Sequence, residues 1–241
     1  MAGGEPLVAL RRVRKEYPAL RPLRVEHFEL RDTETVALVG FDRSAAEVLV
    51  NLITGATLPD AGEIELFGAP TRTIADSDAW FRLLDRIGIL SDRVVLLEEL
   101  TVEQNLAVPI TLEVEALPAD VRERVQRLAG EIGLATDLMR QSLAAADQAT
   151  RARVRLGKAL ALEPRILLAE HPTAALDGDD VPRFAAVLSD IAAQRRLAML
   201  ILTADATFGA AACRQLLRFE PASGRLAAES GWRKWLAWRA P

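Results

Sequence analysis

The sequence lacks most features of secreted and membrane-spanning chains. Its 241 residues include one cysteine, Cys213, which excludes an internal disulfide and is typical of a reducing compartment. No stretch approaches the roughly 18 uninterrupted apolar residues that a transmembrane helix needs. Residues 1–17 have no long apolar core behind a basic start, so we expect no signal peptide. Any association with a membrane should therefore come through a partner.

A strong charge of one sign is also missing. The formal net charge is −4, although 27% of the residues are charged. This balance gives no indication of a broad nucleic-acid-binding face, so we expect no nucleic-acid partner. Half of the residues are apolar, which is enough to build a sizeable core. The length suits one domain, or one domain with an inserted subdomain, and we expect a single domain over residues 1–241.

Short apolar runs alternate with helical periodicity along most of the chain. Residues 35–39, 165–169 and 198–202 are typical of strands buried on both faces. Helical patterns follow the first two of these, over residues 45–53 and 181–194. This alternation predicts an α/β fold with a mostly parallel sheet that is flanked by helices.

Other segments extend this scheme. Residues 7–13 are predicted to form an edge strand, and residues 25–30 are predicted to form another edge strand. Helical periodicity dominates from about residue 92 to residue 160, which predicts an inserted helical subdomain. The tail, residues 230–241, carries tryptophans at every third position with basic residues between them. It is expected to lie in a bilayer interface, against a partner helix, or against its own domain.

One segment keeps the frame of a phosphate-binding loop but not its chemistry. A loop of the form G-x-x-x-x-G-K-[ST] needs a second glycine, a lysine and a hydroxyl. Gly40 holds the first position, but Ala45, Ala46 and Glu47 hold those three. The residues between include Asp42, Arg43 and Ser44.

These replacements act against a bound phosphate. Ala46 carries no charge, and Glu47 puts a carboxylate where a Mg²⁺-binding hydroxyl belongs. Two like charges about 4 Å apart repel by roughly 4 kcal/mol at an effective dielectric constant of 20. We therefore expect ATP and Mg²⁺ to bind weakly or not at all. Alternatively, Glu47 is a solvated first-turn glutamate that the helix dipole favours.

Four separated segments resemble the nucleotide-binding subunit of ABC transporters. They are Pro59–Gly68, Glu99–Pro109, Ala159–Asp177 and Met199–Asp205, and their order and spacing also match. The sequence AEHPTAALD within the third is most similar to the subgroup that powers lipoprotein release and macrolide export. The resemblance implies a P-loop NTPase-like domain with N-terminal antiparallel strands. It also implies dimerisation and a transmembrane permease partner on the cytoplasmic face of the inner (plasma) membrane.

The resemblance also assigns positions in the nucleotide site. Tyr17 matches the aromatic that stacks on adenine, and Arg43 could supply some positive charge. Asp92 stands where a glutamine couples Mg²⁺ to the membrane subunit. The signature segment that caps ATP on the opposite subunit has lost its serine and both glycines. Its equivalents here are Leu143, Ala144, Ala145, Ala146 and Asp147.

The remaining matched positions concern catalysis. Glu170 replaces the metal-side aspartate and could still hold Mg²⁺ through water. His171 replaces the glutamate that orients the attacking water, and Ala204 replaces the switch histidine. Asp177 is retained, in a loop that usually lies at the dimer interface.

We therefore predict a non-catalytic ABC-type subunit of a membrane transporter complex. It would act as a scaffold or a regulatory partner of a permease and of an active ATPase subunit, as a homodimer or a heterodimer. The first alternative is an atypical ATPase that energises export of a lipid, lipoprotein or small molecule, using Arg43, Glu170 and His171. The second is a regulator that is bound to no transporter.

Overall fold

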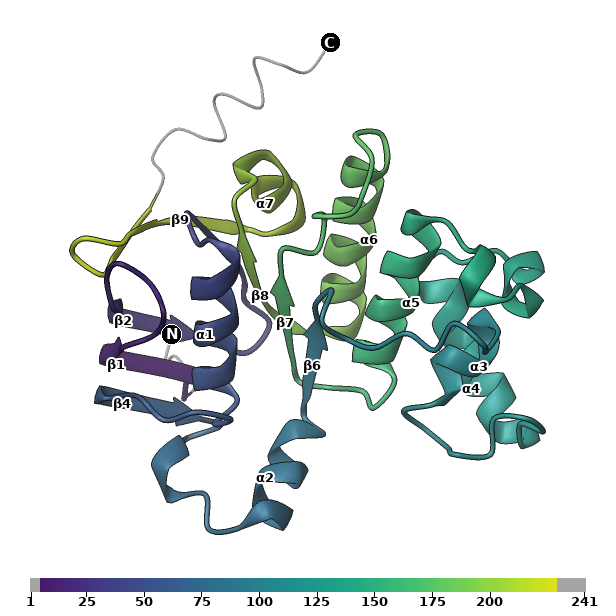
Figure 1. The fold of residues 1–241 in the computed structure, drawn as a ribbon, viewed down its shortest axis with the longest axis horizontal. Helices are drawn as coiled ribbons and strands as arrows, with labels where there is room; N and C mark the ends of the chain where they lie inside the picture. The colour runs from purple at the N-terminus through teal and green to yellow at the C-terminus, as the bar shows by residue number, and fades with distance from the viewer. Residues whose placement is uncertain (1–4, 229–241) are drawn as a thin grey trace.

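Within residues 5–228, which the computed structural model describes, the strands form two sheets (Figure 1). The first sheet is antiparallel and has the order β2-β1-β4-β5. Its strands are β1 (Val8–Lys15), β2 (Leu23–Leu30), β4 (Ala61–Leu66) and β5 (Ala69–Pro70). β1 pairs with β2 on one side and with β4 on the other, so the edge strand predicted for residues 7–13 was wrong. Alternation along β1 reports its buried face but not how many neighbours it has.

The second sheet has the order β10-β9-β3-β8-β7-β6. Its strands are β3 (Thr35–Val39), β6 (Ile87–Leu90), β7 (Ile166–Glu170), β8 (Ala198–Thr203), β9 (Gln215–Glu220) and β10 (Arg225–Ala228). Every pairing in this sheet is parallel except that of β9 with β10. The predicted α/β fold with a mostly parallel sheet is confirmed.

The helices follow the strands in the expected alternation. They are α1 (Arg43–Ile53), α2 (Ser77–Leu84), α3 (Val102–Ala107), α4 (Ala119–Glu131), α5 (Gln148–Leu160), α6 (Asp180–Arg195) and α7 (Ala206–Ala212). Short 3₁₀ turns add η1 (Thr71–Thr73), η2 (Thr136–Arg140) and η3 (Leu143–Ala145). α3, α4 and α5 gather beyond β6, on the far side from the antiparallel sheet (Figure 1). No helix in residues 5–228 is long and apolar enough to cross a membrane.

The core lies on both faces of the parallel sheet. Val36 and Leu38 of β3 belong to the cluster that contains α1 and the antiparallel sheet. Ala37 and Val39 belong to the cluster that contains α6, α7 and the helices beyond β6. Because successive side chains of a strand point to opposite faces, one apolar run serves both layers. Because β3, β6 and β7 all run parallel within the sheet, the loops that follow them leave its carboxyl end together, and they carry the site.

Candidate functional site

The loop after β3 is shaped by a glycine and an aspartate. Gly40 has a φ of 102°, and a Cβ there would lie 3.1 Å from the Phe219 carbonyl oxygen. Glycine alone adopts this conformation readily in so close a space. Asp42 follows as the N-cap of α1, and its carboxylate accepts a 2.8 Å hydrogen bond from the Ala45 N–H. The helix therefore begins at Arg43 and not at Ala45, the start that periodicity predicted.

This cap engages N–H groups of the first turn of α1. A helix N-terminus attracts phosphate because its first N–H groups lack partners. Here the Asp42 carboxylate occupies the Ala45 N–H, and the Asp42 carbonyl accepts the Ala46 N–H at 2.9 Å. Ala45 and Ala46 are both buried within α1, and neither has a positive φ. The protein's own carboxylate thus satisfies one of the N–H groups at this helix end that could otherwise contact an anion.

Arg93, in the loop after β6, bridges two carboxylates from different elements. Its Nε donates to Glu170 Oε2 at 3.0 Å, its Nη2 donates to Glu170 Oε1, and its Nη1 lies 3.2 Å from Glu47 Oε1. Ser91 Oγ donates a further hydrogen bond of 2.9 Å to Glu170. The hydrogen bond to Glu170 and the negative charge of that carboxylate, followed by the charges of Glu47 and Asp92, raise the pKa of Arg93.

The exposure of the three charged groups differs. Glu170, at the end of β7, is only 6% exposed. A carboxylate buried to this degree requires a compensating positive charge and hydrogen-bond donors. Arg93 supplies both, although its own side chain is 41% exposed and Glu47 is also solvent-accessible. The bridge therefore joins α1, β7 and the loop after β6 around one guanidinium.

Sequence reasoning missed Arg93. The resemblance drew attention to the neighbouring Asp92 and gave Arg93 no role. The one available signal was the pair of acidic replacements, Glu47 and Glu170, because two carboxylates brought to one place need a cation. Only the fold shows that the cation comes from this loop.

Arg43, Asp92 and Tyr17 also lie near the loop. Arg43 Nη1 pairs with Asp92 Oδ2 at 2.5 Å in a solvent-exposed ion pair. The positive charge of Arg43 is thus paired within the protein. Burial, and then the Asp42 carboxylate, raise the pKa of Tyr17, which is partly buried beside the loop. Ser44 is exposed at the start of α1.

The segment Leu143–Asp147 is held by internal contacts. Its first residues form η3, and Asp147 is the N-cap of α5, accepting the Thr150 N–H at 2.7 Å. The Arg151 side chain donates to the carbonyls of Leu143 and Ala146, and it forms a bidentate pair with Glu98, with both distances 2.7 Å. Polar groups of this segment and of the start of α5 therefore have hydrogen-bond partners within the chain.

Asp147 gives a direct test of this cap. We expect Asp147→Ala to lower the free energy of unfolding by about 1 kcal/mol, because the Thr150 N–H loses its acceptor. That hydrogen bond lowers the pKa of Asp147, so its contribution is present above the ordinary carboxyl pKa and is lost as the pH falls through the lowered value. Urea unfolding at pH 7 and at pH 3 measures both effects. Asp147→Asn, which keeps an acceptor, should lose less; equal losses would contradict the cap.

The remaining predicted positions surround the ends of β7 and β8. His171 directly follows Glu170, has a φ of 41°, and donates its backbone N–H to the Leu202 carbonyl at 2.8 Å. Its buried Nε2 has no hydrogen-bond partner among the described residues. Ala204 is exposed after β8, and Asp177 is exposed in the loop before α6. No group of acidic, histidine and cysteine residues in the described chain is arranged to hold a metal ion.

A family model described as "ABC transporter" matches residues 23–174, well over half of the chain. The chain belongs to the ABC transporter family. One relative is the lipoprotein-releasing system ATP-binding protein LolD of Psychrobacter arcticus. It is 28% identical over 184 residues, which are 76% of this chain and 81% of that protein. The methionine import ATP-binding protein MetN 2 of Pseudomonas syringae pv. tomato is 29% identical over 78% of this chain. The match spans only 55% of the MetN 2 length.

Solved structures agree with the fold. The structure of cbiO1 from Clostridium perfringens, part of the ABC transporter complex cbiONQ, superposes with a TM-score of 0.80 at 20% identity. This match covers 97% of this chain and 91% of cbiO1. The dimeric structure of MJ0796, a bacterial ABC transporter cassette, gives a TM-score of 0.75 at 20% identity, covering 91% of this chain and 96% of the cassette. Both have the ABC ATPase cassette fold seen here.

The family implies Mg²⁺ and ATP, and the residues present do not fit this pair. In P-loop NTPases, Mg²⁺ is held by the hydroxyl at the Glu47 position and the carboxylate at the Glu170 position. Here a guanidinium lies between these two side chains. The helix N-terminus that would receive phosphate is capped by Asp42. An internal cation and an internal anion therefore lie among the groups that would hold the metal and the phosphate.

Proposed function

We propose that this chain is a non-catalytic ABC-type subunit of a membrane transporter complex. The observation that supports this most is the Arg93 bridge between Glu47 and Glu170. A positive side chain among the groups that would coordinate Mg²⁺ repels the ion and satisfies its would-be ligands at the same time. A metal ion could enter only if this bridge opened.

The other replacements act in the same direction. Phosphoryl transfer depends almost wholly on positioning and on stabilising charge, and losing one well-placed donor costs about 100- to 1,000-fold. The lysine position is Ala46, and the Leu143–Asp147 segment has neither the serine nor the glycines of the signature. Among the described residues, the loop after β3 offers no unpaired cation in place of that lysine, because Arg43 is paired with Asp92.

We further propose that the chain works through contact. As one domain with an inserted helical subdomain, it would dock on a transmembrane permease at the cytoplasmic face of the inner membrane. It would serve there as a scaffold, or as a regulatory partner of an active ATPase subunit. In a head-to-tail dimer each nucleotide lies between one phosphate loop and the opposite signature segment, so this chain would weaken both sites of a heterodimer. The tail, residues 230–241, lies outside the described residues.

Nucleotide binding and hydrolysis test the proposal. We expect calorimetry with Mg-ATP to detect no binding tighter than about 1 mM, a free energy of roughly −4 kcal/mol. We also expect phosphate release to equal that of the Glu170→Gln, His171→Ala double variant. The same measurements examine the alternative of an atypical ATPase. Hydrolysis by the wild-type chain that the double variant abolishes would establish that alternative and end the proposal.

The partner is tested separately. Tagged protein purified from native membranes should bring down a permease in stoichiometric amount. Recovery of the chain alone, at membrane-extraction conditions that preserve other ABC complexes, would favour a regulator that is bound to no transporter.

A further inference from the structure

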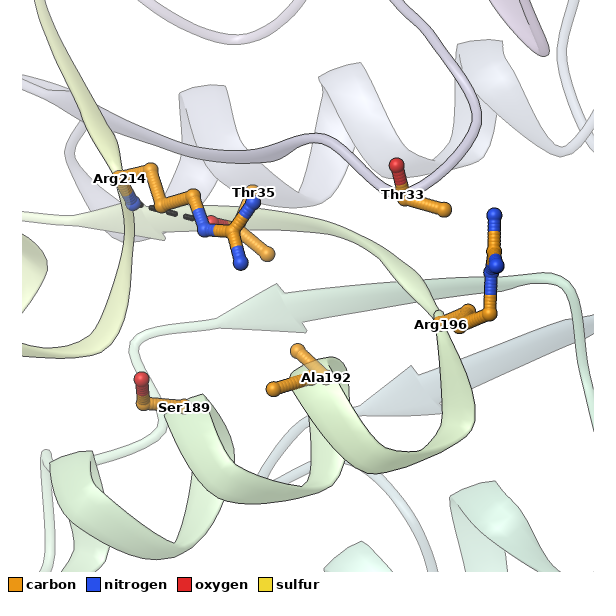
Figure 2. A pocket seen from close by; sticks show the side chains of 7 residues that line it. Thr33, Thr35, Ser189, Ala192, Arg196 and Arg214 are labelled. Carbon is orange, nitrogen blue, oxygen red and sulfur yellow. Dashed lines mark hydrogen bonds between the residues drawn. The ribbon is translucent and has the colours of Figure 1, made fainter.

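Two arginines line a cavity at the end of the parallel sheet opposite to the Arg93 bridge. A cavity of about 230 Å³ is bounded by the start of β3, the last turns of α6 and the start of β9. Figure 2 shows Arg214 and Arg196 on opposite sides of this cavity, with Ala192 of α6 between them. The residues lining it are Thr33, Thr35, Ser189, Ala192, Ala193, Arg196 and Arg214. We propose that this cavity binds a phosphate-bearing anion.

The charges around the cavity favour an anion. Arg196 and Arg214 are both exposed, and neither side chain has an ion-pair partner among the described residues. No carboxylate lines the cavity. Glu34 lies between two lining threonines in sequence, but its carboxylate accepts a hydrogen bond from the Arg31 N–H at 2.8 Å. Two guanidinium groups thus face a space that holds no internal counter-charge.

Hydroxyl groups complete the set of donors. The buried Thr35 Oγ accepts the Arg214 N–H at 2.9 Å, which fixes the backbone of Arg214 and leaves the hydroxyl hydrogen available to a ligand (Figure 2). Thr33 and Ser189 add two further hydroxyls. Guanidinium and hydroxyl donors around one small space match the oxygens of a phosphate group.

The C-terminal end of α6 is capped where it borders the cavity. The C-terminus of a helix carries partial negative charge, which would repel an anion. Here Arg196 adopts a left-handed conformation with a φ of 53°, and it ends the helix as its C-cap. The N–H groups of Leu197 and Arg196 donate to the carbonyls of Ala192 and Ala193, at 2.9 and 3.4 Å. These bonds satisfy two of the carbonyls in the last turn of α6.

The size of the cavity limits the ligand. It is smaller than the roughly 300 to 1,000 Å³ of most small-molecule sites. Inorganic phosphate or a single phosphomonoester group would fit within it. The site is also separate from the loop after β3, because the five residues of β3 span about 13 Å at a rise of about 3.3 Å per residue. The proposal therefore does not depend on the fate of the nucleotide site.

Calorimetric titration of the full chain with inorganic phosphate, at constant ionic strength, tests this site. We expect saturable binding in the range of about 0.1 to 1 mM, weakened at least about tenfold by Arg196→Asn and by Arg214→Gln. Asparagine is chosen at position 196 because it tolerates a left-handed backbone. Arg183→Ala removes the same charge from the exposed start of α6 and should leave binding unchanged. Thermal melting followed by circular dichroism checks that each variant is folded.

Further measurements distinguish free phosphate from a lipid headgroup, and this cavity from the loop after β3. Arg196→Lys and Arg214→Lys keep the charge and should retain part of the affinity. Flotation is measured with phosphatidylcholine vesicles that contain or lack phosphatidic acid. A lipid headgroup is the source of the phosphate if the protein floats only with the acidic vesicles and if Arg196 and Arg214 control this binding. Phosphate binding that both neutral variants leave unchanged would instead point to the loop after β3 and overturn the proposal. So would the absence of binding to either phosphate or acidic vesicles.

Discussion

Replacing Arg93 with alanine should lower the free energy of unfolding by about 2 kcal/mol. Glu170 is 6% exposed and would lose its counter-charge, keeping only the Ser91 hydrogen bond. Removing one member of a fully buried ion pair costs about 3 to 5 kcal/mol. The lower figure expected here reflects the 41% exposure of Arg93, since water can replace part of what the guanidinium provides. Urea unfolding at neutral pH measures the loss.

Two matched variants make this expectation specific. Arg43→Ala removes the same charge from the exposed pair with Asp92 and should cost no more than about 1 kcal/mol. The double variant Arg93→Met, Glu170→Leu removes both charges and should recover most of the stability, because apolar replacement of a whole buried pair is often neutral. Equal losses for Arg93→Ala and Arg43→Ala would show that the bridge contributes nothing beyond a surface pair.

Restoring the phosphate loop should reveal nucleotide binding only when Arg93 is also removed. The loop variant Ala45→Gly, Ala46→Lys, Glu47→Ser restores the motif that holds phosphate and metal. With Arg93 still beside Glu170, the metal remains excluded, and we expect little gain in affinity for Mg-ATP. Adding Arg93→Ala should tighten binding by about 100-fold, equivalent to roughly 2.7 kcal/mol. Calorimetry with Mg-ATP on the four proteins of this double-mutant cycle measures the coupling.

Magnesium provides the control for this experiment. If Arg93 acts by occupying the metal position, the gain should appear with Mg-ATP and be much smaller with ATP in excess chelator. An equal gain under both conditions would mean that Arg93 hinders the phosphates and not the metal. A loop variant that binds Mg-ATP tightly with Arg93 in place would sink the idea that the bridge blocks the site. Because Ala46 is fully buried, melting curves must accompany each titration.

Helix and strand positions followed closely from the sequence. The apolar runs at residues 35–39 and 198–202 became β3 and β8 within one residue, because strands buried on both faces need such runs wherever they lie. The start of α1 was missed by two residues. Periodicity found its apolar face, but the start depends on the Asp42 carboxylate reaching the Ala45 N–H.

The pairing of strands could not be predicted in the same way. The edge position expected for residues 7–13 failed because alternation is a property of one strand, whereas its neighbours depend on where distant segments return. β1 meets β4 about fifty residues later in the chain, after β3 and α1 have been completed.

The sequence by itself determined the α/β architecture and placed Ala46 and Glu47 directly after the first buried strand and its turn, since these follow from local patterns and residue identity. It did not determine what fills the resulting space. Only the tertiary structure brings Arg93 to Glu47 and Glu170, 46 and 77 positions away along the chain. It alone also brings Arg196 and Arg214 to one cavity. Electrostatic pairing depends on distance in space, and the folded sheet sets that distance.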